Sequence, residues 1–455
     1  MGKKPEEQKT ISRRNFFKFS GAAIAGSTIN FLPFNRARTQ DKQEEGAKVK
    51  KFRILGRTGF KVGDISMGTT RVRDANIVRY AYDKGVNYFD TGETYGNGMA
   101  ERFIGEMLKY MDRKKIFITT KIHLRDNESE ESIMDRFKNC LGRLQTDYID
   151  AFYMHGVTDV NMLNHAAFHE VATRLKSEGK MRFIGLSSHG PRGNEGDSME
   201  KVMCAAAEDG RFDLMLFIYN FMNKESGDKI LAACKKKNVG TTAMKTSPGV
   251  LAVDPIDPEN LTEDQERYVN RIMDRGSSRE QALERLKSRT KSQQESYEKT
   301  KPFIEKYNVK TADDLRKISI HWVVQNEDMH TTCVSFADFD LVDRIIPISG
   351  TKLSQAEMKF LEEYKLAFEN QYCRHGCNAC TAACRLKLPV STIMRYAYYY
   401  ETQGREKDAM QKYANLRERN ASNCAGCDAP CLGNCPFGVD IQSQLVQAHS
   451  MLTFV

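Results

Sequence analysis

Short hydrophobic runs alternate with longer amphipathic stretches between residues 52 and 366. The runs are rich in β-branched and aromatic residues, whereas the stretches between them repeat their apolar positions with the period of a helix. Several stretches end in Gly or Asn just before the next run, as helices commonly do. Strands that alternate with helices build a parallel sheet, and eight of them close a barrel. The pattern therefore predicts an α/β fold, a (β/α)8 TIM barrel, with strands at 63–69, 86–91, 116–121, 148–155, 182–188, 212–220, 239–245 and 330–335.

Two further segments belong to the predicted barrel region. Residues 52–62 are expected to form a small hairpin that covers the bottom of the barrel. Residues 251–310, between the seventh and eighth strands, are polar and charged. We expect this insertion to form surface helices that cap the active face of the barrel.

Composition is that of an ordinary globular protein. The 455 residues are 40% hydrophobic and 28% charged, which suits one large domain and one small domain. The net charge of +9 is concentrated at one end, because residues 1–40 hold eight Lys/Arg and two Glu and leave only +3 for the rest. No basic patch interleaved with aromatic residues stands out, so we expect no nucleic acid as a partner.

The first 40 residues carry a pattern that resembles a twin-arginine export signal. Arg13 and Arg14 lie inside SRRNFFK and are followed by a modestly apolar run over 16–34. The run is too short and too polar for a membrane span, and a basic tail beside a short apolar helix is the plainer interpretation. We expect export of the folded protein by the twin-arginine translocase to the periplasm or the inner-membrane surface, with a cytoplasmic location as the alternative.

Eight of the twelve cysteines lie in the last 83 residues, in two groups of four. Two or three residues separate neighbouring cysteines, close to the ferredoxin run C-x2-C-x2-C-x3-C-P that binds iron–sulfur clusters. Each group differs from that run by one inserted residue, and only the second ends in proline. The spacing predicts ligands for two [4Fe–4S] clusters, which move single electrons; they are Cys373, Cys377, Cys380 and Cys384, and Cys424, Cys427, Cys431 and Cys435.

Zinc and disulfides are the alternatives for these cysteines. Zinc ribbons usually supply two separated pairs of ligands, whereas each group here supplies four sulfurs within 12 residues. Disulfides need specific separations and directions, which such crowding rarely satisfies. The remaining cysteines are isolated in apolar segments and are expected to be ordinary buried thiols; they are Cys140, Cys204, Cys234 and Cys333.

Four polar residues lie at the carboxyl ends of predicted strands, where barrel enzymes carry their chemistry. Asp90 ends the second strand, Lys121 the third and His155 the fourth, while Tyr95 follows in the loop TGETYGNG. A phenol is a weak acid at neutral pH, and a nearby ammonium lowers its pKa. We expect Tyr95 to give a proton to a carbonyl oxygen, with Asp90 orienting Lys121 and His155 positioning the substrate.

These residues and their context resemble the aldo-keto reductase superfamily. The likeness covers about residues 52–366 and includes NYFDTGETYGNGMAERFIGEML, TTK and MHG. It implies a TIM barrel that binds NADPH or NADH and passes hydride to or from a carbonyl, with Ser187, Asn220 and Lys245 near the nicotinamide. The tail resembles the small α-helical, ferredoxin-like domain of one iron–sulfur branch of these reductases.

This chain departs from the family pattern at the expected nucleotide site. Leu216 stands where many members carry glutamine, and Met244 stands where an aromatic residue stacks on the nicotinamide. The loop after the eighth strand holds Ser335, Asp338 and Asp340 instead of a glycine and a basic residue. Carboxylates repel a 2′-phosphate, which weakens the case for NADPH and, less strongly, for any dinucleotide. An exported enzyme also meets little free nicotinamide nucleotide, so we expect it to retain its cofactor tightly or to work without one.

Two functions therefore stand as expectations. The first is an exported oxidoreductase that acts on a carbonyl or alcohol and exchanges electrons with a redox partner protein. The second is an iron–sulfur electron-transfer or binding protein on a barrel scaffold without hydride chemistry. The expected division of the chain is a signal peptide at 1–40, a linker at 41–51, the barrel at 52–366 and the iron–sulfur domain at 367–455.

Overall fold

The structure of the protein is a computed structural model. The proposed signal peptide, with Arg13 and Arg14, and the first part of the linker lie outside the described residues. Much of the first stretch of the charged insertion does so as well. The structure describes residues 46–453 apart from 193–194, 249–256, 258, 262, 275, 308, 310, 402 and 404.

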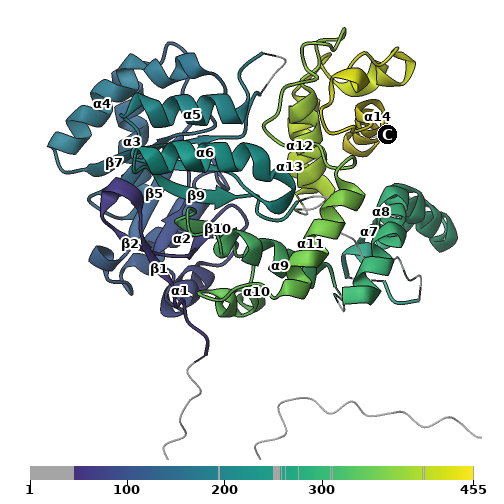
Figure 1. Ribbon diagram of the computed structural model, residues 1–455, viewed down its shortest axis with the longest axis horizontal. Coiled ribbons are helices and arrows are strands. Elements are labelled where there is room, and N and C mark those ends of the chain that lie inside the picture. Colours follow the sequence, from purple (N-terminus) through teal and green to yellow (C-terminus); the bar gives the residue numbers. More distant parts are fainter. Residues whose placement is uncertain are drawn as a thin grey trace, which may run out of the picture. The chain divides into compact units, whose positions relative to one another are not determined.

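Eight parallel strands form a closed barrel, which confirms the predicted fold (Figure 1). Each strand pairs with the strands before and after it in the chain, and the last pairs with the first. The carboxyl ends of all eight strands therefore meet at one mouth. The strands are β3 (Ile65–Gly68), β4 (Tyr88–Asp90), β5 (Phe117–Ile122), β6 (Ile149–Met154), β7 (Met181–Ser188), β8 (Leu214–Ile218), β9 (Gly240–Met244) and β10 (Thr331–Ser335).

Helices follow the strands and bury one apolar face each against the outside of the barrel (Figure 1). Their starts follow the capping rules, because side chains such as Ser129 and Ser198 accept a hydrogen bond from the first turn. Phe137 of the third helix packs edge-on against Phe152 of β6 at 5.0 Å. The helices are α1 (Ala75–Asp83), α2 (Met99–Leu108), α3 (Glu130–Leu144), α4 (Ala166–Ser177), α5 (Met199–Asp209), α6 (Lys224–Lys236), α9 (Ala312–Val324) and α10 (Phe339–Ile345). The next helix, α11 (Gln355–Phe368), packs instead in a separate apolar cluster with Leu315 and Ile318 of α9.

A hairpin closes the end of the barrel opposite the mouth, as predicted. Its strands β1 (Phe52–Ile54) and β2 (Lys61–Gly63) pair antiparallel. Leu55, in the turn between them, is fully buried beneath the barrel. Gly56 has a φ of +49°, and a Cβ there would lie 2.3 Å from the backbone nitrogen of Gly240, so this close approach requires glycine.

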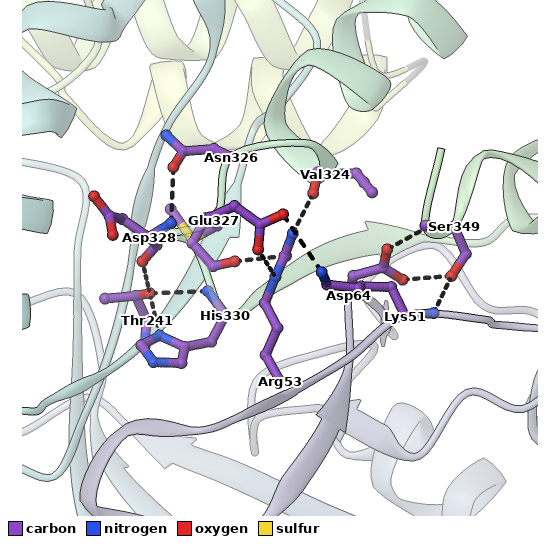
Figure 2. A network of polar contacts seen from close by, with 12 residues as sticks. Lys51, Arg53, Asp64, Thr241, Val324, Asn326, Glu327, Asp328, His330 and Ser349 are labelled. Carbon is purple, nitrogen blue, oxygen red and sulfur yellow. Dashed lines mark hydrogen bonds and ion pairs between the residues drawn. The ribbon is translucent and has the colours of Figure 1, made fainter. Parts of the chain in front are cut away.

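Polar contacts fasten the hairpin to the segments around β10 (Figure 2). The Arg53 guanidinium donates to the backbone oxygens of Val324 and Met329 at 2.8 and 2.7 Å. Ser349 donates to the buried carboxylate of Asp64 at 2.6 Å. Burial raises the pKa of Asp64, and these donors oppose that shift. These contacts tie the bottom of the barrel together.

The described part of the charged insertion forms helices α7 (Glu263–Met273) and α8 (Arg279–Tyr307). Phe303 of α8 packs against Phe368 of α11, with ring centroids 6.1 Å apart. Lys306 of α8 forms an ion pair with Glu363 of α11 at 2.9 Å. These contacts place α8 against α11. A helix from the cysteine-rich region contacts the loops at the mouth through His189 and Ser247, which the sequence did not predict.

The cysteine-rich region contains α12 (Val390–Glu401), α13 (Glu406–Ala414) and α14 (Ile441–Leu452), which share a small apolar core. Its contacts with the barrel lie in the loops at the carboxyl ends of the strands. The backbone nitrogen of Met199 donates to the oxygen of Gly376 at 2.8 Å. A Cβ on Gly190 would lie 2.4 Å from the Cα of Gly376, so two backbones meet here. Across the described residues, no helix is both long enough and apolar enough to cross a bilayer.

Candidate active site at the barrel mouth

The four predicted catalytic residues all lie at the mouth of the barrel. Asp90 is the last residue of β4, and Lys121 is the fifth residue of β5. His155 follows β6 directly, and Tyr95 lies in the loop between β4 and α2. The structure therefore brings together residues that are far apart in the sequence, as expected for the carboxyl ends of neighbouring parallel strands.

Lys121 and Asp90 form a buried ion pair. The Lys121 Nζ donates to Asp90 Oδ1 and to the backbone oxygen of Thr91, both at 2.5 Å. Its side chain is fully buried, and that of Asp90 is 5% exposed. Thr119 donates to the same carboxylate oxygen at 2.9 Å. These contacts fix the ammonium in place, as the sequence predicted.

Tyr95 lies between the ammonium and a histidine ring. The Lys121 Nζ is 5.1 Å from the centroid of the Tyr95 ring, and His155 meets this ring edge-on at 5.6 Å. Burial raises the pKa of Tyr95 well above its usual value, and the charge of Asp90 raises it further. The sequence argument predicted a lowered pKa and was wrong in this respect, because burial, and after it the Asp90 carboxylate, raise the pKa of the phenol. Tyr95 is therefore a neutral phenol that holds its proton.

His155 is a buried, neutral imidazole. It stacks on His123 with ring centroids 3.9 Å apart, and His123 Nδ1 lies 2.7 Å from the His155 backbone oxygen. Burial lowers the pKa of His155 well below its usual value, and the charges of His123 and Lys121 lower it further. The Nδ1 atom of His155 is buried without a hydrogen-bond partner among the described residues. A buried polar atom of this kind is ready to bond a substrate group.

Asn220, a predicted nucleotide contact, has its hydrogen-bonding capacity filled within the protein. Its Oδ1 accepts from the backbone nitrogens of Met222 and Asn223 at 3.0 and 2.9 Å. Its Nδ2 donates to the backbone oxygen of Lys245 at 2.9 Å and to the hydroxyl of Tyr372 at 3.3 Å. An amide has two acceptor and two donor positions, so none remains for a ligand.

The other predicted nucleotide contacts also have partners. Ser187 Oγ accepts from the backbone nitrogen of Gly156 at 3.0 Å and is nearly fully buried. Lys245 directs its Nζ to Nδ1 of His189 at 3.1 Å and toward the ring of Tyr399, at 5.4 Å from the centroid. The structure thus places all three at strand ends, as predicted, and turns Lys245 toward α12.

The loop after β10 is acidic and makes its own structural contacts. Asp338 accepts from the backbone nitrogen of Leu341 at 2.7 Å and caps α10, and both Asp338 and Asp340 are exposed. Ser335 shares a hydrogen bond of 2.6 Å with Thr70. A carboxylate at a helix N-terminus interacts favourably with the helix dipole. This loop therefore repels a phosphate group.

The eight clustered cysteines form two sets that exchange their fourth members. A small cavity, partly open to solvent, is lined by three cysteines of the first sequence group and the last one of the second. All twelve cysteines are free. The sequence grouped them by proximity along the chain, and the structure corrects this. The two sets are Cys373, Cys377 and Cys380 with Cys435, and Cys424, Cys427 and Cys431 with Cys384.

The sulfurs of each set repel one another as thiolates. Burial raises the pKa of Cys373, and the charges of Cys380, Cys377 and Cys435 raise it further. Burial raises the pKa of Cys424 to about 11, together with its neighbours in the second set. Thiolates gathered in this way need a cationic group between them. Among the described residues, no His, Cys, Asp or Glu side chains converge on a point that suits a single metal ion.

Four residues at the mouth were not found from the sequence. His123 follows Lys121 by two positions and so shares a face of β5, which is a signal that could have identified it. His189 follows β7 immediately. Arg395 and Tyr399 come from α12, and nothing in their local sequence indicates that they reach the barrel.

Comparison with known proteins identifies a family domain in this chain. Residues 55–365 match the model of the aldo/keto reductase family. The aldo-keto reductase YhdN of Bacillus subtilis is 33% identical over 129 residues, which cover 27% of this chain and 38% of that protein. L-galactose dehydrogenase of Arabidopsis thaliana is 31% identical over 153 residues, 30% of this chain and 47% of that protein. The chain thus spans less than half the length of these curated relatives.

Solved structures show a weaker similarity. An aldo-keto reductase from Klebsiella pneumoniae in complex with NADPH aligns with a TM-score of 0.48 and 18% identity, over 70% of this chain and 95% of that chain. The aldo-keto reductase AKR11C1 from Bacillus halodurans aligns with the same TM-score, at 20% identity, over 69% of this chain and 95% of that chain.

The buried ion pair yields a first prediction. Lys121→Met should lower the free energy of unfolding by about 3–5 kcal/mol, because it leaves the Asp90 carboxylate buried without a cation. Adding Asp90→Asn should restore most of that loss, since neither charge then remains. Denaturant unfolding of the two single variants and the double variant measures the coupling.

An exposed ion pair provides the control for this measurement. Lys229 pairs with Glu200 on the surface, where its side chain is 65% exposed. Lys229→Met should change the free energy of unfolding by less than about 1 kcal/mol. If Lys121→Met costs no more than this control, the buried pair does not organise the mouth.

Proposed function

The chain belongs to the aldo/keto reductase family, and we propose that it is an exported oxidoreductase that acts on a carbonyl or alcohol substrate. The observation that carries the proposal is the arrangement of Tyr95 and His155 around the buried Lys121–Asp90 pair. A neutral phenol beside a fixed ammonium and a neutral imidazole suits proton transfer to a carbonyl oxygen.

Each residue has a separate role in this proposal. Tyr95 holds the proton that is given to a carbonyl oxygen, or takes it back from an alcohol. Lys121, oriented by Asp90, stabilises the negative charge that develops on the phenol oxygen. His155 directs a hydrogen bond to the substrate oxygen and so positions it. Because burial keeps His155 neutral, it offers this bond without a competing positive charge.

A nicotinamide nucleotide fits the described residues poorly. The side chain of Asn220 is saturated, and the loop with Asp338 is acidic. No step of the proposed chemistry therefore passes through NADPH or NADH. The activity assay compares NADPH, NADH and an artificial acceptor as electron carriers for the substrate. The proton chemistry at Tyr95 is independent of that choice.

Two [4Fe–4S] clusters fit the cysteine-rich region well. The sulfurs of Cys373, Cys377, Cys380 and Cys435 surround a cavity, which suits a polynuclear cluster better than one zinc ion. The backbone nitrogens of Val439 and other loop residues donate to the sulfurs, for example at 3.4 Å to Cys435, as N–H groups do around iron–sulfur clusters. When bound, such clusters supply single-electron transfer, so a redox partner protein is part of the proposal.

A second function keeps the clusters and discards the reductase chemistry. In that alternative the barrel is a scaffold for an electron-transfer or binding protein. The saturated side chain of Asn220 favours it, because it speaks against hydride transfer from a nucleotide. The buried Lys121–Asp90 pair beside Tyr95 favours the enzyme, since a scaffold has no need of a buried charge pair at its mouth.

The clusters provide the second prediction. Anaerobically purified protein should contain about eight irons with matching sulfide and should bleach with dithionite. Cys435→Ser should lose the cluster held with Cys373 and leave about four irons, because the structure assigns Cys435 to that set. Cys204→Ser, an isolated thiol, is the control and should keep all the iron. Stoichiometric zinc or four disulfides in the native protein would refute the clusters.

The export signal provides the third prediction. The translocase reads Arg13 and Arg14 as a pair, so replacing both with lysine should retain the protein in the cytosol. Cell fractionation followed by immunoblotting compares this variant with the native chain. Native protein in the cytosol, or the variant outside the inner membrane, would show that the proposed location is wrong.

The reductase chemistry provides the fourth prediction. Tyr95→Phe removes the transferable proton and keeps the ring, so turnover should fall on the order of 10²–10⁴-fold. The assay supplies carbonyl and alcohol substrates with NADPH, NADH and an artificial electron acceptor in turn. Iron content should be unchanged in this variant, because the cysteines are separate from Tyr95. Undiminished activity of Tyr95→Phe on every substrate would leave the scaffold alternative standing.

A further inference from the structure

Cationic side chains gather at the mouth beside the proposed catalytic residues. Lys245, just after β9, directs its Nζ to Nδ1 of His189 at 3.1 Å. Arg395 of α12 donates to the backbone oxygen of the same His189 at 3.2 Å and to Thr392 at 3.4 Å. Neither cation forms an ion pair with a carboxylate of the described residues. Two elements far apart in the chain thus bring positive charge to one histidine.

Arg395 is held out of water and Lys245 is partly so, and no carboxylate of the described residues pairs with either cation. Arg395 is 5% exposed, and burial lowers the pKa of Lys245 to about 8. Burial also lowers the pKa of His189 well below its usual value, and Lys245 and Arg395 lower it further, so the ring is neutral and accepts from Lys245. Removing a cation from water is costly unless an anion accompanies it. The arrangement therefore suits a negatively charged ligand.

Tyr399 adds a hydroxyl to this group. Its ring lies 5.4 Å from the Lys245 Nζ and 4.6 Å from Cζ of Arg405. Arg405 already has a carboxylate partner, because it donates to Asp408 at 2.6 Å. Burial alone would raise the pKa of Tyr399, but Lys245 and the two arginines lower it to about 8. At neutral pH the hydroxyl keeps its proton and can donate it in a hydrogen bond.

The cations are close to the catalytic residues and separate from the cysteines. The charge of Lys245 lowers the pKa of His155, and Tyr399, where it is ionised, raises the pKa of Tyr95. The cation that acts on the cysteine sulfurs of the first set is instead Arg374. The positive charge of Lys245 and Arg395 is thus directed at the mouth, where a substrate would lie.

We propose that Lys245, Arg395 and Tyr399 form a subsite for an oxyanion group, a carboxylate or phosphate carried by the substrate itself. This inference rests on the proposed function, and it places the substrate carbonyl at Tyr95 and the anionic group beneath α12. The pyrophosphate of a nucleotide is also an oxyanion and would bind the same three side chains. The saturated Asn220 and the acidic loop after β10 favour the substrate as its source.

Matched pairs of compounds test the subsite on the holo-protein, purified anaerobically. The pairs are pyruvate and methyl pyruvate, 4-formylbenzoate and its methyl ester, and glucuronate and glucose. Calorimetric titration measures binding, and steady-state assays measure turnover with each electron carrier. At least one acid should bind and react about 10- to 100-fold better than its neutral partner, the usual value of a charged hydrogen bond.

Variants of Lys245 test whether this residue causes the preference for acids over their neutral partners. Lys245→Met should weaken binding of the preferred acid about 10- to 100-fold and raise its KM far more than that of the neutral partner. Lys245→Arg should retain most of the preference, because it keeps the charge. Lys236→Met is the control, since this lysine is 72% exposed on α6 and pairs with Glu208. Visible absorbance of the clusters and the melting temperature check that each variant is folded.

The outcomes separate this inference from the proposed function. Binding of none of the three acids, or equal use of acids and neutral partners by the native protein, would overturn the subsite and leave the oxidoreductase. Acids that bind through Lys245 without any turnover would keep the subsite and remove the oxidoreductase. Parallel titrations use NADPH and inorganic pyrophosphate. If Lys245→Met weakens these and leaves the acids unaffected, the oxyanion belongs to a nucleotide and the proposal is wrong.

Discussion

The buried ion pair between Lys121 and Asp90 is the contact on which the barrel mouth depends. A charge that leaves water must find a partner, and here the partner comes from the adjacent strand of the barrel. The pair is satisfied only while β4 and β5 keep their register, so the geometry of the site and the closure of the barrel support each other. Tyr95 and His155 then take their places around a fixed ammonium.

The need of a buried charge for a partner also explains the surroundings of Lys245 at the mouth. Lys245 also leaves water, but its strand supplies no carboxylate, and the protein places a neutral histidine and a tyrosine beside it instead. The tyrosine comes from α12, so the cysteine-rich region contributes directly to the surroundings of the proposed catalytic residues. The mouth thus contains one charge that is balanced internally and others that an anionic ligand would balance.

Much of the fold and part of the site followed from the sequence, because both depend on local patterns. The period of the apolar positions identified the eight strands, and strand ends located Asp90, Lys121 and His155. What failed depends on contacts between distant segments. The raised pKa of Tyr95 reflects burial in addition to its neighbouring charges, and Arg395 reaches His189 across 206 residues of chain. The hydrogen bond from Asn220 to Tyr372 likewise joins two segments that are far apart in the sequence.

The exchange of cysteines between the two sets has a consequence for α12. Cys384 precedes this helix and belongs with the set that follows it, whereas Cys435 follows the helix and belongs with the set that precedes it. Clusters bound as proposed would therefore tie together the chain on both sides of α12. Since Arg395 and Tyr399 lie on that helix, binding of the clusters and completion of the mouth would depend on the same contacts. A protein built as proposed would need its clusters before it is fully folded, which agrees with the proposal that it is exported in the folded state.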